Sequence, residues 1–205
     1  MKKTSSLIAF CFLIVTAYTQ PSGYAYGKTV EMLYTEVSGA DDLSNFTAVI
    51  SLIDEDLRSV ANGGNVQSED GHDIVFTLED AFTIIDHQIE SYNPVTGEYI
   101  AWILVPNLSA STNTMLHMYY GNASIVTDPS TTAVWGGEYG AVWHMDEAPV
   151  GAGPQLIDNT SNINDGTANG GMTASDLVAG KIGKAIDFDG SNDYLDCGDF
   201  NSSDP

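Results

Sequence analysis

Runs of alternating apolar and polar residues, separated by turn residues, fill the chain from Thr29 onward. These runs are rich in β-branched and aromatic side chains, a composition typical of strands. We expect strands over residues 30–37, 46–53, 72–77, 84–92, 98–105 and 114–120. No long amphipathic helix is indicated between them. The spacing therefore predicts an all-β fold that begins with a β-sandwich domain.

One of these runs is apolar on both of its faces. Residues 99–105 read YIAWILV, so we expect a central strand that is covered on both sides. Pro106 follows and is expected to end this strand, because proline has no N–H to donate to a neighbouring strand. Between the second and third strands, residues 54–61 predict one or two helical turns, with Asp54 as the cap.

The pattern changes after the last of these strands. Residues 127–132 are polar and turn-forming, which suits a domain boundary, and a new apolar strand is expected over residues 139–145. Closely spaced turn sequences then separate shorter strands. We expect one domain at residues 28–135 and a second at 138–205. The second has too few strands to close two sheets, so we interpret it as the opening strands of an incomplete, truncated jelly-roll sandwich.

The N-terminus predicts an export signal. Two lysines precede an apolar run of about ten residues, which is too short to cross a bilayer. The sequence VTA, ending at Ala17, fits a signal-peptidase site, and Ala25 is the alternative. Removal of residues 1–17 also removes Cys11 and leaves Cys197 as the only cysteine. We expect a bacterial protein that is secreted, exposed on the cell surface or periplasmic, with no membrane insertion after signal removal.

Charge excludes two classes of partner. The chain has 28 acidic and 6 basic side chains and a formal net charge of −22. Such a field repels nucleic acid and anionic lipid, so we expect neither as a partner. The acidic residues are scattered, which favours a solvated surface, and divalent cations are the functional alternative.

The C-terminal stretch KAIDFDGSNDYLDCGDFNSSDP, residues 184–205, has the densest group of aspartates. It does not fit the EF-hand pattern, because Asn192 occupies the glycine position when loop positions are counted from Asp187. Alternation instead predicts an early hairpin, with Ile186 and Phe188 facing a core. Asp187 and Asp189 would share a face of that strand and are the candidate cation ligands. Calcium is the candidate ion, provided that other segments supply further oxygens.

A second oxygen-rich stretch covers residues 158–166. It has Ile163 where a tight cation loop requires glycine, so a turn held by bonds from side chains to backbone is the better interpretation.

The sequence indicates no catalytic centre. No carboxylate pair has the arrangement that glycoside hydrolysis requires, the histidines lack ligand spacing, and no serine lies in a nucleophile elbow. Aromatic residues near the domain junction are better candidates for ligand binding, and we expect them to be exposed. The candidate ligand-binding residues are Trp135, Tyr139, Trp143 and His144.

Four ordered motifs carry a family resemblance. GHDIVFTLED (71–80), HQIESYN (87–93), AWILVPNLSAS (101–111) and MYYGNAS (118–124) resemble the bacterial extracellular domain of unknown function 2341 over about residues 28–135. AVWHMDE (141–147), LIDNTSNINDGTANGG (156–171) and VAGKIGKAIDFDGSNDYLDCG (178–198) are similar to the start of the concanavalin A-like, laminin-G-like lectin domain.

The resemblance implies β-sandwich modules of a secreted or surface protein. The first family has no established activity, and the second includes carbohydrate-binding, adhesive and hydrolytic members. We therefore expect a non-catalytic module that binds carbohydrate or cell-surface glycans. Two alternatives remain open: a structural spacer of a large adhesin, and an accessory region of a polysaccharide-degrading enzyme.

Overall fold

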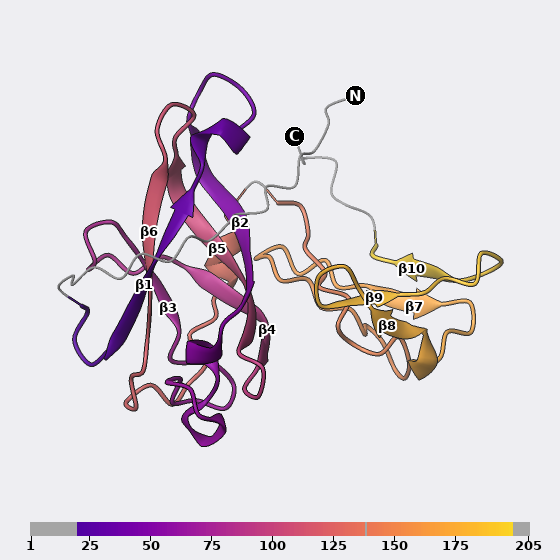
Figure 1. The fold of residues 1–205 in the computed structure, drawn as a ribbon. Coiled ribbons are helices and arrows are strands. Elements are labelled where there is room, and N and C mark those ends of the chain that lie inside the picture. Colours follow the sequence, from indigo (N-terminus) through magenta and orange to yellow (C-terminus); the bar gives the residue numbers. More distant parts are fainter. Residues whose placement is uncertain (1–19, 138, 199–205) are drawn as a thin grey trace. The chain divides into compact units, whose positions relative to one another are not determined.

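The computed structural model describes residues 20–137 and 139–198, which form two compact units (Figure 1). The first unit ends at Val134 and the second begins at Trp135. Strands and short 3-10 turns make up the regular structure of these residues, so the predicted all-β class is confirmed. The predicted signal peptide and its cleavage site at Ala17 lie outside the described residues.

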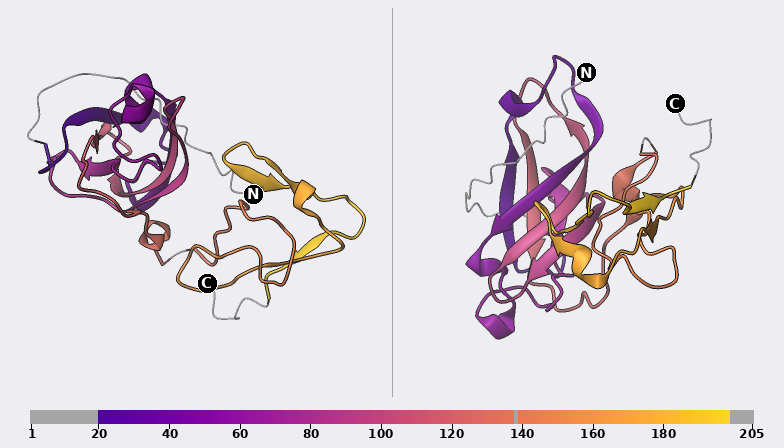
Figure 2. Two further views of the ribbon diagram at one scale, coloured as in Figure 1. Left: turned by 90° about the horizontal axis from the view of Figure 1, so that it is seen from below. Right: turned by 90° about the vertical axis from the view of Figure 1, so that its right-hand side faces the viewer.

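The first unit is a sandwich of two antiparallel, three-stranded sheets, which face each other when viewed along the strands (Figure 2). One sheet has the order β1-β6-β3 and contains β1 (Tyr26–Met32), β6 (Thr114–Tyr120) and β3 (Val75–Leu78). The other has the order β2-β5-β4 and contains β2 (Leu43–Ile53), β5 (Glu98–Leu108) and β4 (His87–Asn93).

Alternation along the strands builds the core between the two sheets. On β1, Val30 and Met32 are fully buried, while Glu31 between them is not. Successive side chains of a strand point to opposite faces, so one residue in two reaches the core. The largest buried side chains of this core include Met32, Phe76, Tyr99, Ile103, Leu116, Met118 and Tyr120.

β5 is the central strand of its sheet, as expected, and it buries residues on both faces. The expectation that Pro106 ends it is wrong, because the strand continues to Leu108. The N–H of Leu104 points toward the β4 side, where it donates to Asp86 O. By alternation, the missing N–H of Pro106 would point to the same side, beyond the last β4 partner of β5 at Ile103. The proline therefore removes no bond between strands.

The first strand is displaced from its predicted position. β1 covers Tyr26–Met32 rather than residues 30–37, and a 3-10 turn, η1 (Tyr34–Glu36), follows it. The partner strand β6 begins at Thr114, opposite Met32, so no ladder is available further along. The side chain of Asn113 instead accepts the N–H of Tyr34 at 3.2 Å.

The predicted helical stretch at 54–61 consists of two 3-10 turns, η2 (Glu55–Leu57) and η3 (Val60–Asn62). Asp54 caps the first of them, since its Oδ1 accepts the N–H of Asp56 at 2.9 Å. Leu57 is fully buried in the core, which anchors the turn to the sandwich.

β3 begins later than predicted because a buried carboxylate organises the residues before it. Asp73 is fully buried and accepts backbone N–H groups from two separate loops. The donors, at 2.8–3.1 Å, are Gln67, Ser68, Gly121 and Asn122. A buried charge requires such partners. Asp73 thus ties the GHDIVF motif to the YYGN motif.

In its described residues, the second unit has four short strands in two antiparallel pairs, with order β10-β7 and β8-β9. These are β7 (Thr167–Asn169), β8 (Leu177–Ala179), β9 (Lys184–Ile186) and β10 (Tyr194–Asp196). The remaining 3-10 turns are η4 (Thr132–Trp135) and η5 (Ala174–Asp176). Leu156 is fully buried and bridges to Gly166.

Residues 139–145 do not form the strand that the sequence predicts. Side chains, rather than a neighbouring strand, satisfy much of their backbone. The amide of Asn162 donates to the carbonyl oxygens of Tyr139 and Gly140, at 2.9 and 3.0 Å. The N–H of Val142 donates to Asp158 Oδ1 at 2.9 Å. A single bridge, between Trp143 and Asp158, is the only strand-like pairing of this segment within the described residues.

The predicted C-terminal hairpin is also corrected. β9 and β10 flank the Asp189 turn, yet β9 pairs with β8 and β10 pairs with β7. Asp187 and Asp189 follow the end of β9 rather than lying on it. Phe188 is 44% exposed, so it lies outside any core in the described chain.

Candidate functional site

Three of the four candidate aromatic residues lie together in the second unit. The ring of Trp135 lies 5.5 Å from the ring of Tyr139, nearly perpendicular to it, and 5.5 Å from the imidazole of His144. These separations and tilts are typical of favourable aromatic contacts. We call Trp135, Tyr139 and His144 the aromatic cluster.

The expectation that Trp135 is exposed is wrong. It is 3% exposed, and the rings of Tyr139 and His144 pack against it. Tyr139 is 38% exposed and His144 is half-buried. Trp135 is therefore the buried member of the cluster, and Tyr139 is its most exposed member.

The indole of Trp143 has an anchor of its own. Its indole N–H donates to the carbonyl oxygen of Asn164 at 2.9 Å, and its backbone bridges to Asp158. These two contacts hold the half-buried indole of Trp143 against residues 158–166. The sequence placed all four aromatic residues in one group, whereas the structure joins three and anchors the fourth nearby in the chain.

The stretch 158–166 forms the framework behind the cluster. Asp158 Oδ1 accepts N–H groups from Val142 and Thr160, and Oδ2 accepts from Asn164 N–H and the Thr160 hydroxyl, all at 2.8–2.9 Å. Burial raises the pKa of Asp158, but these hydrogen bonds outweigh it, so the pKa lies below its ordinary value. The predicted turn of bonds from side chains to backbone is confirmed.

Asparagine side chains connect this framework to the segment that carries Tyr139. The amides of Asn162 and Asn164 both donate to Gly140 O, at 3.0 and 2.8 Å. An amide group offers two donors and needs no charge to hold a carbonyl oxygen. These bonds restrict the backbone beside Tyr139 and so position its ring.

Glu147 is a candidate that the sequence reasoning missed. Its Oε1 accepts the N–H of Ile157 at 3.1 Å, while its buried Oε2 has no hydrogen-bond partner in the described residues. Burial, and then the neighbouring Asp146, raise the pKa of Glu147. The signal was the acidic pair in WHMDE, directly after Trp143 and His144.

The candidate cation ligands, Asp187 and Asp189, lie at the turn that follows β9. Asp189 Oδ1 accepts the N–H groups of Ser191, Asn192 and Asp193, which lowers the pKa of Asp189 and forms the turn after β9. Asp187 is exposed beside it. In the described part of the chain, no three His, Cys, Asp or Glu side chains are grouped so that they could hold a metal ion.

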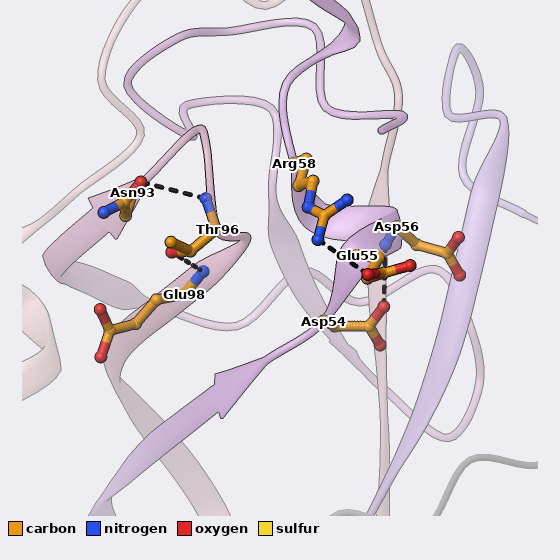
Figure 3. Close-up of polar contacts among 7 residues, drawn as sticks. All are labelled: Asp54, Glu55, Asp56, Arg58, Asn93, Thr96 and Glu98. Carbon is orange, nitrogen blue, oxygen red and sulfur yellow. Dashed lines mark hydrogen bonds and ion pairs between the residues drawn. The ribbon is translucent and has the colours of Figure 1, made fainter. Parts of the chain in front are cut away.

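A second group of polar residues lies at one end of the first unit (Figure 3). Asp54, Asp56 and the ion pair of Arg58 with Glu55 belong to the turn after β2. The adjacent turn between β4 and β5 packs closely against it, since Asp54 N–H donates to Gly97 O at 3.1 Å. The sequence analysis did not single out this group.

The comparisons concern mainly the first unit. Residues 70–152 match the family model "Domain of unknown function (DUF2341)". The matched segment contains all four motifs that carried the first resemblance. It omits β1 and β2, extends beyond Val134, and includes AVWHMDE, which the sequence analysis assigned to the lectin-like part.

No curated protein and no solved structure matches the chain. Within residues 20–137 and 139–198, no helix has the length and apolar character needed to cross a membrane.

Proposed function

We propose that the chain is a non-catalytic module of a secreted or cell-surface protein, and that it binds carbohydrate or cell-surface glycans through the aromatic cluster. The observation that carries the proposal is the partly exposed ring of Tyr139, which packs on Trp135 as His144 also does. Small-molecule sites combine apolar rings with a few positioned polar groups.

Rigidity supports this assignment. The Asn162 and Asn164 amides fix the backbone beside Tyr139, and the Trp143 indole is anchored by its own hydrogen bond. A surface that is already ordered loses less conformational freedom when a ligand binds. The assignment of residues 138–205 to a concanavalin A-like domain, with calcium as its candidate ion, belongs to the same proposal.

The proposal is tested by binding to a glycan array and to insoluble polysaccharides, with calcium present and with a chelator. We expect saturable binding that Tyr139→Ala weakens roughly tenfold, the equivalent of about 1.4 kcal/mol. Tyr34→Ala is the matched control, because Tyr34 is 42% exposed but lies in the first unit.

Three results would count against the proposal. Binding that Tyr139→Ala and Tyr34→Ala reduce equally would remove the aromatic cluster as the site. Absence of binding to every glycan would favour a structural spacer of a large adhesin. A catalytic domain on the same polypeptide would instead favour an accessory region of a polysaccharide-degrading enzyme.

A further inference from the structure

Lys28 is a lysine inside the first unit. It lies on β1, two residues before Val30 and four before Met32, so alternation turns all three toward the core. Its side chain is only 4% exposed. A buried ammonium group is costly unless partners compensate it. Lys28 Nζ contacts Asp54 Oδ2 and lies 3.0 Å from Asp56 Oδ2.

The carboxyl group of Asp54 is fixed in place at the end of β2. Its Oδ1 accepts the N–H of Asp56 at 2.9 Å (Figure 3), which leaves Oδ2 facing the lysine. The backbone is held as well, because Gly97 packs against it so closely that an added Cβ would lie 1.9 Å from Asp54 O. The side chain of Asp54 is 18% exposed, so it has limited access to water.

The ring of Tyr120 lies over the ammonium group of Lys28. The Tyr120 ring centroid lies 5.9 Å from Lys28 Nζ, and Tyr26 stacks on Tyr120 with centroids 5.6 Å apart and planes at 18°. Tyr120 is 2% exposed. Burial, and then Asp56 and Asp54, raise the pKa of Tyr120, so its hydroxyl stays neutral beside the two carboxylates.

We propose that Lys28 and Asp54 are joined by an intramolecular isopeptide bond, with Asp56 transferring the protons. The Lys28 nitrogen forms a bond to Asp54 Cγ, and the bond from Cγ to Oδ2 breaks. The two protons that the ammonium nitrogen loses pass through the Asp56 carboxylate to the departing oxygen. The products are one amide and one water, Asp56 is regenerated, and no oxidant or reductant is required.

The positions of the surrounding atoms suit this step. Negative charge that develops on Asp54 Oδ1 is stabilised by the Asp56 N–H, which already donates to that oxygen. Asp56 Oδ2 lies within hydrogen-bonding distance of the attacking nitrogen. Groups held together in this way react with effective concentrations that reach about 10⁵–10⁸ M. The side chain of Asp56 is 55% exposed, so the released water has a path to solvent.

The bond would connect the two sheets of the sandwich. Lys28 belongs to the sheet β1-β6-β3, and Asp54 directly follows β2 of the other sheet. It would also replace a buried pair of charges with a neutral amide, which removes the cost of keeping both charges away from water.

The test is the intact mass of the purified protein, followed by mapping of its proteolytic peptides. We expect the folded wild type to be lighter than its sequence by one water, and one branched peptide to contain Lys28 and Asp54. Lys28→Arg keeps the positive charge but should have the full mass, as should Asp54→Ala. Lys184→Arg, at an exposed lysine of the second unit, is the matched control and should still lose the water.

Two further measurements make the test decisive. Aspartates followed by glycine, such as Asp189, can lose water by closing a succinimide, so the branched peptide rather than the mass alone decides. Asp56→Ala should leave most of the folded chain unlinked. Separate Lys28 and Asp54 peptides from the folded wild type would overturn the bond. Complete linkage in Asp56→Ala would overturn the assigned role of Asp56.

Discussion

His87 places an imidazole inside the core of the first unit. It is 2% exposed, packs edge-on against Phe76 with centroids 5.6 Å apart, and its Nε2 has no hydrogen-bond partner in the described residues. Burial lowers the pKa of His87 because it disfavours the charged ring. The folded chain therefore binds this proton less readily than the unfolded chain does.

This shift predicts a pH dependence of stability. With the folded pKa below the unfolded value of about 6.5, the free energy of unfolding should decrease as pH falls below about 6.5. His87→Gln cannot become charged and should show a flatter profile between about pH 7 and pH 5. Chemical denaturation across this range, compared between wild type and variant, measures the effect. Parallel profiles for the two proteins would contradict it.

Asp73 shows where sequence reasoning at single residues reaches its limit. The sequence analysis placed residues 72–77 in a strand, yet residue 73 supplies a buried carboxylate to two loops. Its backbone donors at Ser68 and Gly121 are 5 and 48 residues away. Nothing in the local alternation encodes the second of these contacts.

Lys28 carried a signal that was available from the sequence. Once a strand is expected near Val30, a lysine two positions earlier must point to the same face as the apolar residues. With few basic residues in the chain, a lysine in that position should have suggested a buried ion pair. Its acceptors, Asp54 and Asp56, become evident only when the two sheets are packed.

Among the elements, the turn between β4 and β5 carries the strictest steric requirement. Gly97 has φ of +73°, and its Cβ would lie 1.9 Å from Asp54 O. Gly63 has a similar φ of +85°, but an added Cβ would meet nothing within 4 Å. Comparison of substitutions at Gly97 and Gly63 therefore separates the cost of backbone strain from the cost of steric overlap.

We expect Gly97→Ala to destabilise the first unit by about 3 kcal/mol, because strain and overpacking add. Gly63→Ala should cost about 1 kcal/mol, from the positive φ alone. The difference in unfolding free energy between the two variants measures the close approach of the turns. Equal losses would mean that the Asp54 turn moves aside easily.

The elements show what hydrophobic alternation predicts well. It located the apolar centres of β2, β5 and β6, whose inner faces pack into the core between the two sheets. It failed for residues 139–145, because Asn162 and Asp158 satisfy that backbone from a distant loop. The expected strand end at Pro106 was also wrong. Where the neighbouring strand β4 stops relative to this proline is known only once the sheet has formed.

At the scale of the whole molecule, charge is the dominant property. A formal net charge of −22 opposes compact folding through repulsion between like charges. Dissolved salt screens this repulsion beyond about 10 Å at 0.1 M ionic strength. We therefore expect the thermal midpoint of unfolding to rise by a few degrees as NaCl increases from low concentration, as measured by circular dichroism.

Calcium chloride at equal ionic strength is the informative comparison. If Asp187 and Asp189 bind calcium, the thermal midpoint should rise more in calcium chloride than in NaCl. The additional rise should be lost in an Asp187→Asn, Asp189→Asn double variant. An equal rise with both salts would assign the whole effect to screening. A midpoint that does not respond to salt would contradict the role given to charge repulsion.

The candidate site was only partly accessible from the sequence. Clustering of aromatic residues in 135–144 was visible, and three of the four side chains do come together. The burial of Trp135 was not visible in the sequence, because it depends on how residues 135–144 fold.

The contact between Lys28 and Asp54 also has a mechanical consequence. The two residues are 26 positions apart, and β1 from Thr29 onward and all of β2 lie between them. With the amide formed, tension applied along the polypeptide would pass from residue 28 directly to residue 54. The enclosed segment, roughly 90 Å when fully extended, could not lengthen under load. The strands after residue 54, β3 to β6, lie outside this closed loop and could still extend under load.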